Sequence, residues 1–151
     1  MDIWWIDSPY ILGSDNPTNA SLEHLRRQGF NVLVSLLEED EQAPRYDISL
    51  TKEMGFIRHN LPVEDFNPPT VNQLLEFIVI VVRLAPESKM VIHCQAGIGR
   101  TGTFAAAYWI FKGMAVADAI AFVRKARWHA IETSAQERIL EEFEVEVRKQ
   151  I

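Results

Sequence analysis

Cysteine is nearly absent from this sequence, because Cys94 is the single one among 151 residues. One cysteine cannot form a disulfide within the chain, so the composition is typical of a reducing compartment, and we expect a cytoplasmic protein. Long apolar segments are also missing. The run Phe77–Val82 is far shorter than the ~20 residues that cross a bilayer, so we expect no membrane partner. The first residues lack a basic stretch followed by an apolar one, so we expect no signal peptide.

Positively charged residues are fewer than negatively charged ones. The chain has 15 Lys and Arg against 21 Asp and Glu, a net charge of −6, which argues against nucleic acid as the main partner. The four histidines lack the spacing of metal ligands, and we expect no metal and no other cofactor. A chain of this length, with 48% hydrophobic residues, predicts one globular domain over residues 1–151, which we expect to be a monomer.

Predicted strands alternate with predicted helices along the chain. Apolar runs favour strands over residues 3–6, 10–12, 32–36, 56–61 and 90–93. Amphipathic or capped segments favour helices over residues 19–28, 45–54, 71–84, 100–112, 116–127 and from 134 onward. This alternation predicts an α/β fold in which helices flank a central, mostly parallel β-sheet. Because residues 71–84 are apolar nearly all round, we expect that helix to pack on two sides.

Two of the predicted helices begin with the sequence pattern of a capping box. In such a box, the N-cap residue and the residue three positions later each bind the other's backbone N–H through their side chains. Thr70 and Gln73 fit this pattern at one helix, and Ser134 and Glu137 fit it at the last helix. Both boxes therefore predict where a helix starts.

The cysteine lies in the segment HCQAGIGRTG, residues 93–102, between a predicted strand and a predicted helix. Ligands in parallel sheets bind beyond the carboxyl ends of strands. The backbone N–H groups of the turn, the helix N-terminus and the planar guanidinium of Arg100 predict an anion site that suits phosphate. The same positive field favours the thiolate of Cys94, a nucleophile able to attack phosphorus. The expected phosphate-binding residues are Gln95, Ala96, Gly97, Ile98, Gly99 and Arg100.

HCQAGIGRTG resembles the Cys-x5-Arg signature loop of the protein tyrosine phosphatase superfamily, and the size and layout of the chain resemble its small dual-specificity branch. The resemblance extends from Ile3 to about Phe143. It implies that Cys94 forms a phosphocysteine, that Arg100 holds the phosphoryl oxygens, and that the Thr101 hydroxyl assists breakdown of the intermediate.

The resemblance implies three further site residues. His93 would order the loop and help to keep the cysteine ionised, unless it is an ordinary buried histidine. Asp65, in the segment PVEDFNPP, matches the general acid that protonates the leaving group; Glu64 is its competitor, and a solvated carboxylate is the alternative. Gln136 matches the glutamine that positions the hydrolytic water, or else it is simply a residue of the first helical turn.

Two features lie outside this pattern. The acidic cluster Glu38–Glu41 follows a predicted strand and supplies either a second acid or, as we favour, solvated charge. The family often has Arg-Pro-Gly where this chain has Arg127, Trp128 and His129, so we expect the local turn and the pocket rim to differ. Arg124, Lys125 and Arg127 form a basic helix face that we expect to be solvated; the alternative is that it attracts acidic flanks of a substrate.

The resemblance implies a metal-independent cysteine phosphatase acting on phosphorylated proteins. The aromatic rim candidates Phe66 and Trp128 favour phosphotyrosine over phosphoserine and phosphothreonine. An RNA 5′-phosphatase or an inositide phosphatase would use the same chemistry, but no lysine or histidine lies between Cys94 and Arg100 to meet extra phosphates. A phosphate-binding module without activity is the non-enzymatic alternative. The aspartate loop and the Arg-Thr-Gly sequence argue against a rhodanese-like sulfur or arsenate handler.

Overall fold

The computed structural model describes residues 1–149, and it contains five strands and six helices in that range. In chain order they are β1 (Ile3–Asp7), β2 (Ile11–Ser14), α1 (Asn19–Arg27), β3 (Phe30–Ser35), α2 (Ile48–Met54), β4 (Ile57–Asn60), α3 (Val71–Val82), β5 (Lys89–His93), α4 (Gly99–Phe111), α5 (Val116–Ala126) and α6 (Ser134–Lys149). The predicted domain, residues 1–151, includes residues 150 and 151, which lie outside the described residues.

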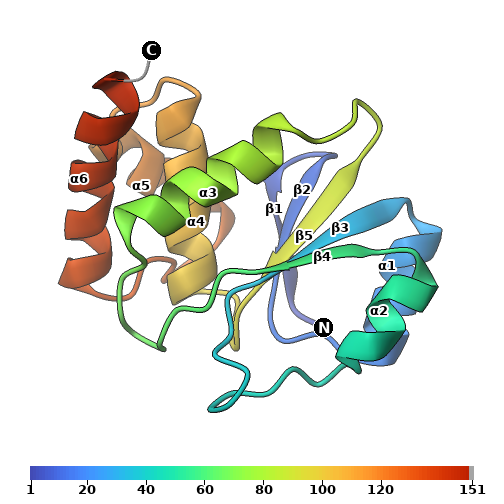
Figure 1. The fold of residues 1–151 in the computed structure, drawn as a ribbon. Helices are drawn as coiled ribbons and strands as arrows, with labels where there is room; N and C mark the ends of the chain where they lie inside the picture. Colours follow the sequence, from blue (N-terminus) through green and yellow to red (C-terminus); the bar gives the residue numbers. More distant parts are fainter. Residues whose placement is uncertain (150–151) are drawn as a thin grey trace.

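The strands form one sheet in the order β1-β2-β5-β3-β4. Only β1 is antiparallel to its neighbour among these strands, so the expected mostly parallel α/β sheet is confirmed. Helices α1 and α2 lie on one side of the sheet, and α3 to α6 gather on the other (Figure 1). Successive side chains of β5 point to opposite faces of the sheet. Val91 packs with the α1 and α2 side chains, whereas Met90 and Ile92 pack with the larger helical layer.

Helix α2 is shorter than expected and begins at Ile48 rather than at residue 45. Asp47 is its N-cap, because its carboxylate accepts a hydrogen bond from Ser49 N at 3.0 Å. The helix ends at Gly55, which has a left-handed φ of 99°. The shorter helix leaves residues 36–47 as a long connection at the carboxyl edge of the sheet.

Helix α3 has the predicted capping box but not the predicted packing. Thr70 Oγ1 accepts from Gln73 N, and Gln73 Oε1 accepts from Thr70 N, both at 3.0 Å. The expectation that the helix packs on two sides is wrong, since Val79 is 45% exposed and Val82 is 63% exposed. The helix packs against α4 and α6, and its outer face borders an open groove beside the edge strand β4.

The capping box of α6 lies one residue earlier than predicted. Thr133, not Ser134, is the N-cap, and its hydroxyl accepts from Gln136 N at 3.1 Å. Gln136 Oε1 in turn accepts from Thr133 N at 3.3 Å. The carboxylate of Glu137, the expected partner of Ser134, instead forms an ion pair with Arg124 at 2.9 Å. Within residues 1–149, no helix is long and apolar enough to cross a membrane.

Candidate active site

The segment that carries the cysteine leaves the central strand β5 and enters α4, and we call residues 94–100 the cysteine loop. Its start is anchored on one side where His93 O accepts from Leu36 N at 2.9 Å. On the other side, Gln95 O accepts from Asn16 N at 3.1 Å. Gly97 has φ 75°, and a Cβ there would lie 2.7 Å from the carbonyl carbon of Ser14. The loop conformation therefore requires glycine at position 97.

The sulfur of Cys94 receives two hydrogen bonds at the centre of this loop. Gly97 N donates to Sγ at 3.2 Å, and Thr101 Oγ1 donates to it at 3.1 Å. The residue is only 2% exposed. Two hydrogen-bond donors are therefore aimed at this one sulfur atom. The geometry suits a nucleophile.

The Arg100 guanidinium connects the cysteine loop to the facing segment, residues 62–69, which we call the acid loop. Arg100 is 2% exposed. Its Nη1 donates to Val63 O at 2.9 Å, and its Nη2 lies 3.2 Å from Asp65 Oδ1. Its buried Nε has no hydrogen-bond partner among the described residues. Buried donors are normally paired, so this N–H fits a site that takes an anionic oxygen.

Asp65 is the acid-loop carboxylate that the structure brings to the arginine. Besides the Arg100 contact, its Oδ1 accepts from Phe66 N at 3.0 Å, and its Oδ2 accepts from Gln42 Nε2 at 3.2 Å. The competing residue Glu64 is exposed to solvent. Phe66 has φ 65°, a left-handed conformation that is uncommon for a bulky residue. The backbone turn at Phe66 therefore helps to aim Asp65 at Arg100.

Gln136 is fully buried and holds the acid loop to the start of α6. Its Oε1 accepts from Glu132 N at 2.8 Å and from Thr133 N at 3.3 Å. Its Nε2 donates to Asn67 O in the acid loop at 3.3 Å. Thr133 Oγ1 adds a second link by donating to Phe66 O at 3.3 Å. Since both ends of the Gln136 amide are occupied by protein groups, its expected role in positioning water stays a prediction.

His93 lies at the buried end of a hydrogen-bonded chain of side chains. Arg58 Nε donates to the Tyr46 hydroxyl at 3.0 Å, and that hydroxyl contacts His93 Nε2 at 2.8 Å. The other ring nitrogen of His93, Nδ1, faces Cys94 O at 3.4 Å. Burial lowers the pKa of His93 to about 3. His93 is held by its contacts with Tyr46 and Cys94 O, and its expected effects on the order of the loop and on the thiolate stay predictions.

The acidic cluster Glu38–Glu41 forms a turn, and its expected role, as solvated charge or as a second acid, stays a prediction. Glu39 forms an ion pair with Arg58 at 2.7 Å. Partial desolvation, together with the neighbouring carboxylates of Glu41 and Glu64, raises the pKa of Glu38. The backbone of the turn closes where Gln42 N donates to Glu38 O at 2.8 Å. The turn thereby places Gln42 at the site.

Arg124 was expected to lie on a solvated basic helix face. Its guanidinium instead binds backbone carbonyls of the segment before α6. Its Nε donates to Ala130 O at 2.9 Å, and its Nη2 donates to Ile131 O at 2.8 Å. His129 and Ile131 have positive φ values of 65° and 63°. Ile131 N also donates to Ile98 O at 3.3 Å. Arg124 thus supports a strained turn that contacts the cysteine loop.

Sequence reasoning missed two residues that connect the loops, Gln42 and Asn16. Asn16 is 2% exposed, and its Nδ2 donates to Gln95 Oε1 and to Ala43 O, both at 3.2 Å. Its Oδ1 accepts from Arg45 N at 3.1 Å. A lone asparagine after a short strand is ordinary turn chemistry, and a lone glutamine in an acidic turn is an ordinary polar residue, so the sequence carried no signal for either.

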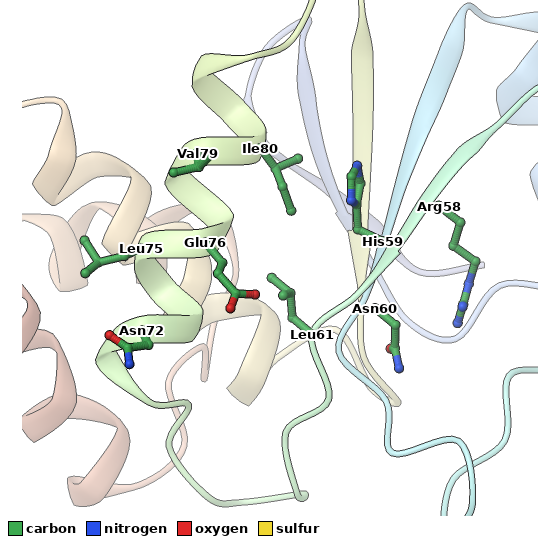
Figure 2. Close-up of a pocket in the computed structure, with 9 residues that line it drawn as sticks. All are labelled: Arg58, His59, Asn60, Leu61, Asn72, Leu75, Glu76, Val79 and Ile80. Atoms are coloured by element: carbon green, nitrogen blue, oxygen red, sulfur yellow. The ribbon is translucent and has the colours of Figure 1, made fainter.

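A cavity of about 770 Å³ lies elsewhere, between β4 and α3 (Figure 2). The view shows His59 and Leu61 of the edge strand side facing Glu76 and Ile80 of the helix. The predicted site residues take no part in its lining. Within residues 1–149, no group of three or more His, Cys, Asp or Glu side chains is arranged to hold a metal ion.

Comparison with known proteins adds to this geometry. A match to the Tc-R-P family, described as a polymorphic toxin system DSP-PTPase phosphatase, covers residues 11–114. Protein tyrosine phosphatase type IVA 3 of Homo sapiens is 33% identical over 140 residues, which cover 88% of this chain and 78% of that protein. Protein tyrosine phosphatase domain-containing protein 1 of Bos taurus is 32% identical over 124 residues, 82% of this chain and 16% of that protein. The chain thus spans a small part of the second relative.

Two solved structures share the fold. Tk-PTP in the active form superposes with a TM-score of 0.86 at 32% identity, covering 95% of this chain and 96% of that chain. PTPMT1 in complex with PI(5)P superposes with a TM-score of 0.87, covering 98% of this chain and 97% of that chain, but at 23% identity it shows the fold alone. Together these findings show that the chain has the fold of a cysteine-based phosphatase. It belongs to the protein tyrosine phosphatase superfamily, in its small dual-specificity branch.

Proposed function

We propose that the chain hydrolyses phosphate monoesters on proteins, phosphotyrosine above all, through a phosphocysteine on Cys94. The observation that carries this proposal is the Arg100 guanidinium, which extends from the end of the cysteine loop and contacts the Asp65 carboxylate and Val63 O of the acid loop. One residue thereby joins the anion site to a group able to supply a proton. The position of Asp65 beside Arg100 supports an enzyme over a phosphate-binding module without activity.

In the first step, the Cys94 thiolate attacks phosphorus. The S–P bond forms while the bond from phosphorus to the ester oxygen breaks. Protonated Asp65 gives its proton to that oxygen, which leaves as tyrosine or another alcohol. Arg100 and the backbone N–H groups of residues 95–100 stabilise the charge on the phosphoryl oxygens in the transition state.

In the second step, water attacks the phosphocysteine. The Asp65 carboxylate accepts a proton from the water, the new P–O bond forms, and the S–P bond breaks to release phosphate and the thiolate. The Thr101 hydroxyl, 3.1 Å from Sγ, stabilises the sulfur as it leaves. Each turnover returns Cys94 to the thiolate and Asp65 to the acid without a metal or a cofactor.

The preference for phosphotyrosine is supported by two exposed aromatic residues. Phe66 in the acid loop is 59% exposed, and Trp128 before α6 is 79% exposed. Trp128 stacks on His129 with ring centroids 4.4 Å apart, so its ring is held at the surface rather than packed in the core. Aromatic side chains at the rim of a phosphate site stabilise a phenyl ring more than the short side chain of serine.

An inositide is the second candidate substrate, because the similarly folded PTPMT1 was solved with PI(5)P. Two features of this chain argue against it. The cysteine loop carries no lysine or histidine after Cys94, and the Glu132 carboxylate lies against Gly99 at the loop. An acidic group at the rim repels the additional phosphates of a multiply phosphorylated ligand.

A substrate panel tests the proposal. One peptide carrying phosphotyrosine, phosphoserine or phosphothreonine in turn, phosphoinositides, and RNA with a 5′-triphosphate are compared by kcat/KM in the presence of a chelator. We expect phosphotyrosine to give the highest value and phosphoserine a weaker but measurable one. The highest value on an inositide or on RNA would reject the protein substrate but keep the cysteine chemistry. Loss of all turnover with chelator would reject the metal-independent mechanism.

A further inference from the structure

Gln42 joins the two charged groups of the site through the two ends of its amide. Its Oε1 accepts a hydrogen bond from Arg100 Nη2 at 2.8 Å. Its Nε2 donates to Asp65 Oδ2 at 3.2 Å. The partners determine which way the amide points, because the guanidinium only donates and an ionised carboxylate only accepts. A carboxylate or an apolar group at position 42 cannot make both contacts.

The backbone around Gln42 is held by the loops that form the site. Gln42 N donates to Glu38 O at 2.8 Å, which closes the acidic turn. The next residue, Ala43, accepts through its carbonyl from Asn16 Nδ2 at 3.2 Å, and the same Nδ2 donates to Gln95 Oε1 in the cysteine loop. Gln42 is thus presented from a segment that is tied to the nucleophile's own loop, and its amide is placed with little freedom to drift.

The contact falls on the Asp65 oxygen that is left to carry the transferable proton. Oδ1 already accepts from Phe66 N at 3.0 Å and lies 3.2 Å from Arg100 Nη2. Oδ2 receives only the Gln42 amide among the described residues. The Gln42 N–H occupies one side of Oδ2, so a proton on this oxygen must point to the other side. General acid catalysis depends on that direction.

We propose that Gln42 is a positioning residue. Its amide, which is held by the Arg100 guanidinium, fixes the orientation of Asp65 for proton transfer. The inference rests on the proposed phosphatase mechanism and adds a residue to it. Gln42 exchanges no proton and touches no reacting atom. Its loss leaves the nucleophile and the anion site in place and makes proton delivery less efficient.

The test uses Gln42→Met, which keeps the length of the side chain without its amide, and Gln42→Ala as a second variant. The kcat/KM, which reports the first step alone, is measured for a series of aryl phosphates, from those with activated phenols as leaving groups to phenyl phosphate. We expect kcat/KM to fall roughly 10-fold for the poorest leaving group and less than about 3-fold for the most activated one, because a good leaving group needs little protonation. Equal losses across the series in both variants would overturn the proposal. Asp40→Ala, a change in the same turn at an exposed residue, is the matched control and should leave the series unchanged.

A double-mutant cycle shows whether Gln42 acts through Asp65. In an Asp65→Asn background, Gln42→Met should change kcat/KM on phenyl phosphate by less than about 2-fold, because the group that it positions has been removed. Inhibition by inorganic phosphate should stay within about 3-fold of wild type in the single variant, since Arg100 keeps its contact with Val63 O. Additive losses in the cycle, or a larger loss of phosphate inhibition, would overturn the inference. No turnover by the wild-type protein on any aryl phosphate would instead defeat the proposed function itself.

Discussion

The Thr101 hydroxyl points at the sulfur of Cys94 from the first turn of α4, over 3.1 Å. Both residues are buried, at 0% and 2% exposure, so the hydrogen bond is shielded from water. Such a bond stabilises a thiolate more than a sulfur that is bonded to phosphorus. The contact is therefore worth most at the end of the second step, when the thiolate leaves.

Thr101→Val removes this donor and keeps the branched shape of the side chain. Breakdown of the phosphocysteine should slow by about 10- to 100-fold, as expected for a hydrogen bond to a charged group of ~1.5–3 kcal/mol. Rapid mixing with an activated aryl phosphate should then show a burst of phenol followed by a slow steady state.

Thr103→Val is the matched control for this experiment. Thr103 is also buried in α4, but its hydroxyl donates to Gly99 O at 2.7 Å instead of to the sulfur. The control should show no burst. A Thr101→Val protein with wild-type turnover and no burst would remove the hydroxyl from the second step.

Asp65→Asn and Glu64→Gln form a pair that separates the two acid-loop carboxylates. Asp65→Asn should slow the hydrolysis of phenyl phosphate by about 100-fold or more and that of an activated aryl phosphate much less. General acid catalysis is typically worth 10²–10⁴-fold, and an activated leaving group needs less of it. Glu64→Gln should leave both rates near wild type, since Glu64 is exposed. The kcat/KM for each of the two substrates, which reports the first step alone, decides between the two carboxylates. Equal losses on both substrates in Asp65→Asn would shift the acid role to a carboxylate of the Glu38–Glu41 turn.

Gly97→Ala should damage the anion site more than Gly99→Ala does. A Cβ at position 97 would meet the backbone of Ser14 and Asp15 at 2.7–2.8 Å, and φ 75° costs a residue other than glycine about 1–2 kcal/mol. The three atoms nearest to a Cβ at position 99 all belong to the flexible side chain of Glu132, which is exposed, rather than to backbone. Inhibition by inorganic phosphate measures the difference, and we expect Gly97→Ala to weaken it roughly 10-fold or more, as for other loop strain of this size. Similar phosphate inhibition in both variants would contradict this assignment.

The parts of the site that could be predicted are those with a local sequence pattern. Cys94, Arg100 and Thr101 lie within eight consecutive residues, and the pattern of spacing alone indicated their loop. The capping box at Thr70 could likewise be predicted, because both of its partners lie in one helical turn. At α6, by contrast, two overlapping patterns competed, and the hydroxyl that caps the helix belongs to Thr133.

The parts that could not be predicted depend on partners far along the chain. Gln42 binds an arginine 58 residues away, and Asn16 binds a glutamine 79 residues away. Neither contact leaves a trace in the residues beside it, because side-chain amides are common in polar turns. The exposed face of α3 could not be predicted for a similar reason. Whether an apolar helix face is covered depends on which elements the topology places beside it, and α3 lies beside β4, which is the edge strand.

His93 makes stability depend on pH. Burial lowers its pKa in the folded protein to about 3, whereas an unfolded histidine has a pKa of about 6.5. Between these values the unfolded chain binds a proton that the folded protein does not, so the stability contributed by neutral His93 is fully present above pH 6.5 and is lost as the pH falls towards 3. From pH 7 to 5.5 the expected loss is about 1 kcal/mol in the free energy of unfolding. Urea unfolding at the two pH values measures it.

His93→Asn should reduce this pH dependence by about 1 kcal/mol over the same interval, because the titrating group is gone. Tyr46→Phe is the informative companion. It removes the hydrogen bond to Nε2 at 2.8 Å but leaves the imidazole buried, and burial is the main cause of the lowered pKa. The Tyr46→Phe protein should therefore be less stable at both pH values while keeping the wild-type difference between them. If His93→Asn loses as much stability from pH 7 to 5.5 as wild type does, His93 is not the titrating group, and the acid sensitivity of the fold arises from its carboxylates.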